Sequence, residues 1–228
     1  DPGLEEAFLK FIEGPFDLKK TALGSNRNIY HSISESTRDG GRICLAGERD
    51  LSGRAAILDQ IDFTGERVLD VGCNLGAVTR YVRSRGASVA DGIEFNPLDA
   101  KLGQFLHCLS PETPGRITHG KLGEGRAISG TYDTVLLFSV FHHLLNPVAA
   151  AQEIGECCQR ILLEAKLNEA GHWYGGKGNT HRLPKWNFKY WDELTAHIER
   201  IFPGFKFKVD YGKGDRGRKI LEFRKEGA

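Results

Sequence analysis

Apolar residues along the chain follow two spacings, one typical of strands and one typical of helices. Short apolar runs predict five strands, at residues 68–71, 87–93, 116–119, 134–140 and 160–165. Helical spacing predicts helices between them and on either side, over residues 51–61, 77–85, 97–109, from 147 onward and 191–202. The Asn-Pro pairs at 96–97 and 146–147 are typical starts of two of these helices. Such alternation predicts an α/β protein with a mostly parallel sheet.

The two ends of the chain depart from this alternation. Before residue 50, the spacing predicts one helix over residues 4–12 and short extended pieces near 28–33 and 42–45. At the C-terminus, Phe205 to Tyr211 alternate apolar with charged side chains, and a glycine-rich turn leads into residues 218–223. This pattern predicts an antiparallel hairpin that closes the sheet.

Length and composition fit one α/β domain without metal or membrane. The chain has 228 residues, of which 40% are hydrophobic, enough for a single core. A formal net charge of +1 argues against a strong global attraction to nucleic acid or anionic lipid. Five cysteines without metal-ligand spacing favour a reducing cytoplasm, and no run of about 18 apolar residues predicts a membrane span.

The most specific signal is a glycine-punctuated turn after the first strand. Residues 68–76 read Val-Leu-Asp-Val-Gly-Cys-Asn-Leu-Gly, so Asp70 is followed by Gly72 and Gly76. Such glycines let the backbone turn sharply beside a ligand. Glu94 ends the next predicted strand, where an acidic side chain can bind both hydroxyls of a ribose. Together these residues predict a nucleotide pocket.

The spacing of the glycines indicates which nucleotide. Asn74 and Ala77 stand where a dinucleotide fingerprint requires glycine, and Asp70 disfavours a phosphate but suits an ammonium and a sulfonium. The segment resembles the first motif of the class I S-adenosylmethionine-dependent methyltransferases, with Asn74 in place of the middle glycine. Asn tolerates the left-handed backbone that such a loop needs.

This resemblance implies a fold, a cofactor and a domain organisation. The implied fold is a Rossmann-like, mostly parallel seven-stranded sheet with helices on both faces and a C-terminal antiparallel hairpin. The implied cofactor is S-adenosyl-L-methionine. Residues 51–228 would form the methyltransferase domain, with a substrate insertion at about 168–190, and residues 1–50 a leader over the cofactor site. Tyr30-His31-Ser32-Ile33 and residues 47–50 resemble the leader of methyltransferases related to the tRNA wobble-uridine carboxymethyl-type enzymes.

The resemblance also implies a set of cofactor contacts. Arg49, in the leader, would reach the carboxylate of the cofactor, and its alternative is a solvated pair with Glu48 or Asp50. Gly123 and Glu124 fall where the family contacts the adenine, although Glu124 is equally explained as a surface charge. The implied cofactor-binding residues are Arg49, Asp70, Gly72, Cys73, Asn74, Gly76, Glu94, Phe95, Gly123, Glu124 and Phe138.

Two adjacent histidines follow the fourth predicted strand. In the family, the end of this strand faces the transferred methyl group, so His142 and His143 are the candidate bases for an acceptor hydroxyl. The alternative is that the pair only hydrogen-bonds the turn or stacks on the cofactor. Methyl transfer depends mainly on alignment of the acceptor with the cofactor.

Residues 171–190 combine basic and aromatic side chains without an acidic residue. This composition suits a phosphate, a carboxylate, a sugar ring or a base, and the alternative is a solvated loop held by its aromatics. The candidate substrate-binding residues are His172, Trp173, Tyr174, His181 and Arg182.

The favoured function is O-methylation of a polar or anionic small molecule or glycan. An RNA-modifying enzyme acting on tRNA is an alternative that the leader and the basic insertion support. A non-catalytic, cofactor-binding scaffold is a third. A metal-dependent reaction is disfavoured, because residues 164–168 supply no clear set of oxygen ligands.

Overall fold

The computed structural model describes residues 30–36, 40, 42–45, 47–109, 115–125, 127–144, 146–167, 188–214 and 217–227. The helix predicted over residues 4–12 lies outside the described residues. The same holds for residues 168–187 of the predicted insertion, which include all five candidate substrate-binding residues.

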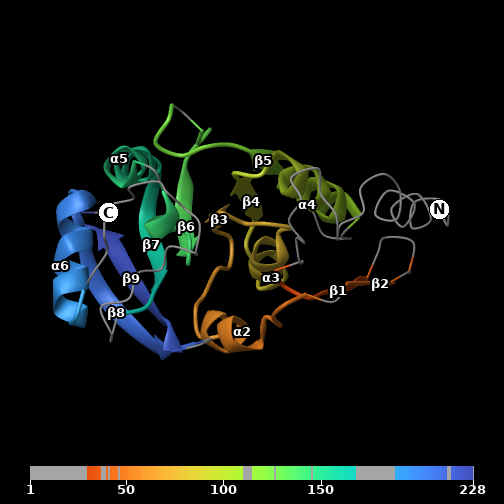
Figure 1. Cartoon of the computed structure of the whole chain (residues 1–228), viewed down its shortest axis with the longest axis horizontal. Coiled ribbons are helices and arrows are strands. Elements are labelled where there is room, and N and C mark those ends of the chain that lie inside the picture. The colour runs from red at the N-terminus through yellow and green to blue at the C-terminus, as the bar shows by residue number, and fades with distance from the viewer. Residues whose placement is uncertain are drawn as a thin grey trace, which may run out of the picture.

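A seven-stranded sheet forms the centre of the protein (Figure 1). Across the sheet, its strands are β5 (Ile117–His119), β4 (Val89–Glu94), β3 (Arg67–Val71), β6 (Tyr132–Phe138), β7 (Cys158–Ala165), β9 (Lys219–Lys225) and β8 (Phe205–Lys213). The first five are parallel, whereas β9 is antiparallel to both β7 and β8. The predicted parallel sheet with a C-terminal antiparallel hairpin is therefore confirmed.

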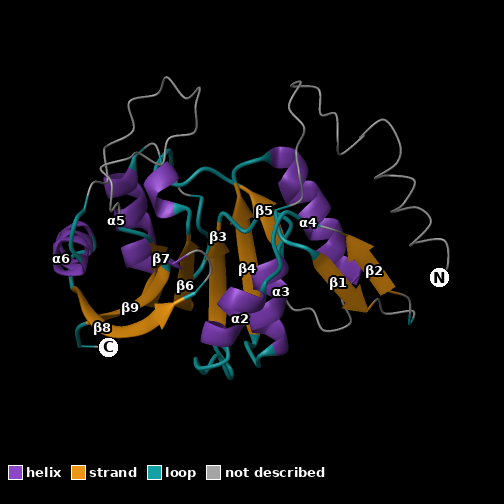
Figure 2. Cartoon of the chain, turned by 60° about the horizontal axis from the view of Figure 1, so that its bottom comes forward, coloured by secondary structure: helices purple, strands orange, loops and turns teal. Residues whose placement is uncertain are grey.

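Helices cover both faces of this sheet (Figure 2). They are α2 (Ser52–Leu58), α3 (Ala77–Ser84), α4 (Pro97–Leu109), α5 (Pro147–Cys157) and α6 (Trp191–Ile201). The Asn-Pro starts are confirmed, since α4 has its predicted bounds and the Asn146 side chain accepts a hydrogen bond from the Ala149 amide. In the described part of the chain, no helix is long and apolar enough to cross a membrane.

The core has one layer on each face of the sheet. Val135 and Leu137 of β6 pack in the same cluster as Ile154 of α5, whereas Leu136 packs with Ile57 and Val82 of α2 and α3. Successive strand residues point to opposite faces, so a strand covered on both sides needs an unbroken apolar run. This explains the uninterrupted apolar run at residues 135–138 in β6, the middle strand of the sheet.

Several elements differ from the sequence prediction in their bounds, and one was not predicted. Helix α2 ends at Leu58 instead of Ile61, because a turn follows it. A short 3₁₀ helix, η1 (Phe141–His143), was not predicted and carries both candidate histidines. In the leader, β1 (Ile33–Ser36) pairs antiparallel with β2 (Arg42–Leu45) as a separate two-stranded sheet, so the first extended piece lies later than residues 28–33.

Packing of α5 on the sheet gives a first prediction. Ile154 is fully buried, whereas Val148 on the same helix is 62% exposed. We expect Ile154→Ala to lower the free energy of unfolding by about 2–5 kcal/mol, because it leaves a cavity, and Val148→Ala to change it by less than about 0.5 kcal/mol. Urea denaturation of both variants measures this, and equal effects would contradict the packing of α5.

Candidate active site

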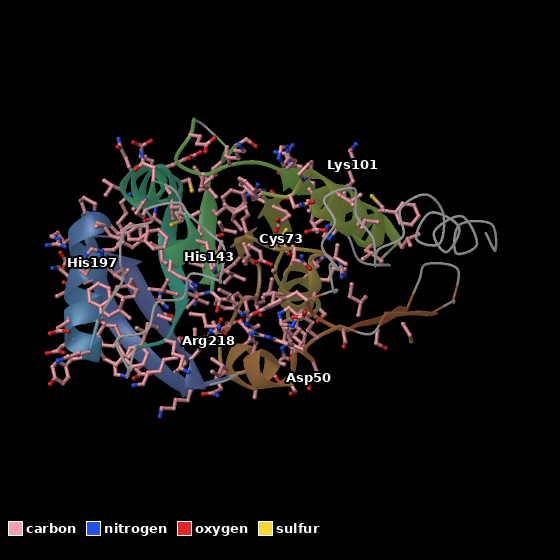
Figure 3. All side chains as sticks on the ribbon, viewed as in Figure 1. Asp50, Cys73, Lys101, His143, His197 and Arg218 are labelled. Atoms are coloured by element: carbon pink, nitrogen blue, oxygen red, sulfur yellow. The ribbon has the colours of Figure 1, made fainter. Side chains whose placement is uncertain are left out.

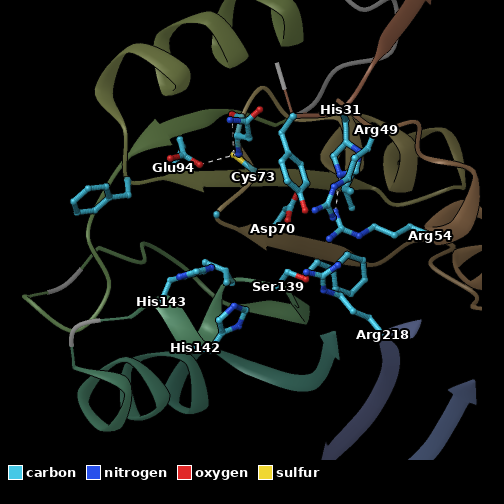
Figure 4. Close-up of a pocket in the computed structure, with 17 residues that line it drawn as sticks. His31, Arg49, Arg54, Asp70, Cys73, Glu94, Ser139, His142, His143 and Arg218 are labelled. Atoms are coloured by element: carbon cyan, nitrogen blue, oxygen red, sulfur yellow. Dashed lines mark hydrogen bonds between the residues drawn. The ribbon is translucent and has the colours of Figure 1, made fainter. Parts of the chain in front are cut away.

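A cavity of about 450 Å³ opens at the carboxyl ends of β3, β4 and β6 (Figure 4). In open α/β sheets, ligands bind at this edge. Figure 3 shows Cys73, His143 and Arg218 near the middle of the molecule, whereas Lys101 and His197 lie farther out. The cavity brings together these predicted site residues: Arg49, Asp70, Gly72, Cys73, Asn74, Glu94, Phe95, Phe138, His142 and His143.

The loop after β3 depends on left-handed backbone. Gly72, Asn74 and Gly76 have φ of 71°, 51° and 77°. Asn74 is one of two described residues other than glycine with positive φ, which explains why Asn is accepted in place of the middle glycine. Gly76 is the N-cap of α3 and does not line the cavity, and a Cβ there would lie 2.3 Å from Ile117 Cδ1. Its role in the structure is therefore packing of the loop on β5.

Asp70 is buried at the end of β3. Its carboxylate accepts a hydrogen bond of 2.7 Å from the Thr79 hydroxyl on α3. Burial raises the pKa of Asp70 to about 6, although the hydrogen bond from Thr79 and the charge of Arg54 act in the opposite direction. A cation in the cavity would favour the ionised form of Asp70.

Glu94 is held by main-chain amides on both sides. One carboxylate oxygen accepts from the Asn74 amide and the other from the Asn96 amide, both at 2.8 Å. Each oxygen keeps a further lone pair, so the fixed carboxylate can still accept hydrogen bonds from a diol. Phe95 beside it is 59% exposed, and the Lys121 ammonium lies 5.2 Å from its ring centroid.

A buried ion pair forms the other side of the cavity. Arg54 of α2 donates two hydrogen bonds, of 2.8 and 2.6 Å, to the two carboxylate oxygens of Glu164 on β7. The Ser139 hydroxyl also donates to Glu164, and Arg218 Nε lies 4.0 Å from the same carboxylate. Burial alone would raise the pKa of Glu164, but Arg54 and Ser139 outweigh it and lower the pKa.

These four residues were missed in the sequence. Arg54 and Glu164 are 110 positions apart, so no local spacing connects them. One signal was available: Glu164 follows a continuous apolar run, and a carboxylate buried at the end of a strand needs a buried partner. Ser139, just after β6, has a positive φ of 56°, and its hydroxyl contacts Glu164. A serine in the sequence gives no sign of this backbone conformation.

The leader contributes Tyr30, His31 and Arg49 to the cavity. The Arg49 guanidinium lies 4.6 Å from the centroid of the Tyr30 ring. Arg54 lies 2.6 Å from His31 Nε2. Because a guanidinium only donates, His31 accepts through an unprotonated Nε2. Burial, followed by the charge of Arg54, lowers the pKa of His31 to about 4, in agreement with that contact.

His142 and His143 lie side by side on η1, with ring centroids 4.0 Å apart. His142 is half-buried and His143 is exposed. Burial lowers the pKa of His142 to about 4, assisted by the charges of His143 and Arg218. The partial burial of its ring, followed by the charge of Arg218, also lowers the pKa of His143. At neutral pH both rings are therefore uncharged and able to accept a proton.

The structure does not bring Gly123 and Glu124 to this cavity. A Cβ on Gly123 would lie 2.6 Å from the Asn146 carbonyl oxygen, so this glycine packs at the start of α5. Glu124 forms an ion pair of 3.5 Å with Lys121, and both side chains are exposed. Among the described residues, no group of three or more His, Cys, Asp or Glu side chains is arranged to hold a metal ion.

The sheet order and the cavity at its carboxyl edge define an α/β domain of the ligand-binding type. The family model described as a methyltransferase domain matches residues 47–209. The chain belongs to that family, and it is a class I S-adenosylmethionine-dependent methyltransferase, as the first motif predicted.

One curated relative is the mitochondrial ubiquinone biosynthesis O-methyltransferase of Schizosaccharomyces pombe. It is 30% identical to this chain over 87 residues, which are 37% of this chain and 31% of that protein. The match thus spans about a third of the relative's length.

Solved structures share the fold. Magnesium protoporphyrin IX methyltransferase from Synechocystis PCC 6803, with bound SAM, has 16% identity and a TM-score of 0.54, over 77% of this chain and 78% of that one. A TehB-like SAM-dependent methyltransferase from Corynebacterium glutamicum has 15% identity and a TM-score of 0.53, over 97% of this chain and 100% of that one.

The contact between His31 and Arg54 gives a second prediction. As the pH falls from about 6.5 to 4, the unfolded chain takes up a proton at His31 that the folded protein does not, so His31 makes unfolding easier. As the pH falls through this window, the free energy of unfolding of the wild type should therefore decrease by up to about 1.4 kcal/mol per pH unit more than that of His31→Gln. Urea denaturation at several pH values measures the difference, and equal slopes would contradict the buried neutral imidazole.

Proposed function

We propose that the cavity binds S-adenosylmethionine and that the protein methylates a hydroxyl of a polar or anionic small molecule or glycan. One observation carries the proposal: a single cavity holds two fixed carboxylates, Asp70 and Glu94, together with two neutral histidines, His142 and His143. The carboxylates suit a cationic nucleoside, and the histidines suit a group that must lose a proton.

The residues around Asp70 and Glu94 fit the cofactor. A Cβ on Gly72 would lie 2.6 Å from Val140 Cγ2, so only glycine lets the backbone approach Val140 this closely at the cavity wall. Asp70 would hold the ammonium group and Glu94 the ribose hydroxyls, with Phe95 against the base. Arg49 would hold the carboxylate, and its guanidinium is already oriented over Tyr30. When bound, the cofactor supplies a methyl group on an electrophilic sulfonium.

The residues around His142 and His143 fit an acceptor hydroxyl. An uncharged imidazole can take the proton of the hydroxyl as the oxygen attacks. The curated relative is an O-methyltransferase, which supports transfer to oxygen. Arg49, Arg54 and Arg218 all line the cavity, and such a polar wall supports a polar or anionic acceptor over an apolar one.

Incubation with isotopically labelled S-adenosylmethionine and a metabolite extract tests the proposal. We expect the label in a small polar product, and mass spectrometry should identify a methyl ether. Labelled tRNA, formed in a salt-dependent reaction, would instead support an RNA-modifying enzyme. Binding of the cofactor without any labelled product would instead support a non-catalytic, cofactor-binding scaffold protein.

The carboxylate of Glu94 gives a third prediction. Glu94→Ala should weaken binding of S-adenosylmethionine by about 1–3 kcal/mol, because charge-assisted hydrogen bonds to the ribose are lost. Glu156→Ala is the matched control, since it removes an exposed glutamate of α5 outside the cavity, and it should leave affinity unchanged. Calorimetry measures both, and tight binding of NADH in place of S-adenosylmethionine would refute the site.

The histidine pair gives a fourth prediction. Only the histidine that faces the acceptor acts as the base, so His142→Ala and His143→Ala should have unequal effects. One of these two substitutions should lower kcat about a hundredfold or more while cofactor affinity stays nearly constant. With the half-buried His142 as the base, kcat/KM should fall only as the pH drops toward about 4. Normal turnover in both variants would mean that transfer depends on alignment alone.

A further inference from the structure

We propose that the Ser139 hydroxyl accepts a hydrogen bond from a second hydroxyl of the acceptor, next to the hydroxyl that is methylated. The acceptor is then a diol with neighbouring hydroxyls, as in a sugar or a dihydroxylated ring. This inference deepens the proposed function, on which it rests, because it names the class of acceptor.

Ser139 lies between the cofactor loop and the histidine pair. The next residue, Val140, packs against Gly72 of the cofactor loop, where a Cβ would lie 2.6 Å from Val140 Cγ2. The helix η1, which carries the histidine pair, begins at Phe141. Figure 4 shows Ser139 in the pocket, between the histidine pair and Arg54 in that view. A ligand group that contacts Ser139 is therefore bordered by the cofactor loop and by the candidate bases.

The backbone of Ser139 has an unusual conformation. Its φ of 56° is in the left-handed region, and Asn74 is the other described residue besides glycine with positive φ. Serine rarely adopts this region, and such outliers gather at sites of binding or catalysis. In this conformation the hydroxyl contacts the Glu164 carboxylate, and the Ser139 amide donates to the Glu164 carbonyl oxygen at 3.4 Å. Two contacts with one residue of β7 thus fix the hydroxyl in the wall of the cavity.

The contact with Glu164 uses the only hydrogen of the Ser139 hydroxyl. Glu164 is 2% exposed, and two hydrogen bonds from Arg54, of 2.8 and 2.6 Å, favour its ionised form. An ionised carboxylate only accepts, so Ser139 donates to it and keeps two lone pairs. Within the described part of the chain, no donor reaches the Ser139 oxygen. Toward the cavity, Ser139 therefore acts as an acceptor and suits an O–H donor.

The donor that contacts Ser139 differs from the hydroxyl that is methylated. In the proposed function, the methylated hydroxyl gives its one hydrogen to a histidine of the pair. Glu164 does not replace that histidine, because its carboxylate is already paired with Arg54 and is a weak proton acceptor. A second hydroxyl can donate to Ser139 while the first is deprotonated. Two such contacts fix the position and the rotation of the acceptor, and methyl transfer depends on this alignment.

Binding of small alcohols to the full chain saturated with S-adenosylhomocysteine tests the proposal. The probes form two pairs, cis-1,2-cyclohexanediol with cyclohexanol and catechol with phenol, and NMR titration measures their affinities. We expect the diol of at least one pair to bind about tenfold or more tighter than the alcohol with one hydroxyl. The pair that shows this preference distinguishes a sugar-like acceptor from an aromatic one. Ser139→Ala should reduce the preference to about threefold or less and leave binding of the single-hydroxyl probe unchanged.

Two matched variants separate binding from folding. Ser139→Gly also lacks the hydroxyl, and glycine favours positive φ, so this variant should lose the preference as Ser139→Ala does. Ser84→Ala removes an exposed hydroxyl at the end of α3, outside the cavity, and should keep the preference.

Three results would overturn the proposal. The first is that neither diol binds better than its single-hydroxyl partner, and the second is that both Ser139 variants keep the preference. The third is a loss of affinity for S-adenosylhomocysteine in Ser139→Ala, which would place the hydroxyl against the cofactor. The same affinity separates this proposal from the proposed function, because its absence in wild type would refute the cofactor site itself.

Discussion

The buried ion pair between Arg54 and Glu164 determines how one side of the cavity is assembled. Both residues are at most 5% exposed, and removing either partner would leave an uncompensated charge at a cost of about 3–5 kcal/mol. Through this pair, α2 is fixed to β7, His31 of the leader is fixed to α2, and Ser139 is fixed at the end of β6. The cavity therefore depends on contacts between segments that are distant in sequence.

The sheet and the cofactor loop could be predicted because their signals are local. A strand was predicted at residues 134–140 because residues 135–138 form an unbroken apolar run, which suits the burial of β6 on both faces of the sheet. Asn74 could be read correctly because a left-handed backbone is a property of a single residue, and its φ of 51° confirms that reading. Glu94 could be placed because parallel strands bring their carboxyl ends to one edge.

The acceptor side could not be predicted, because its contacts are not local. Arg218 reaches the cavity only because the C-terminal hairpin inserts β9 beside β7, which brings Lys219 into register with Ala165. Ser139 is a small polar residue whose contact follows from an unusual backbone angle. Gly123 is a different case: the family resemblance implied a contact with adenine, and in the structure this glycine packs against the start of α5, outside the lining of the cavity.

The division of charge in the cavity links acceptor binding to proton removal. In the free protein, burial and, to a smaller extent, the positive charge of Arg218 lower the pKa of both histidines, which keeps them neutral but makes them weak bases. In the proposed complex, an anionic acceptor would offset that smaller contribution, so the pKa of the nearby histidine would rise. A base with a pKa closer to the working pH accepts a proton more effectively. The histidine thus becomes a stronger base at the moment when the acceptor hydroxyl is in place.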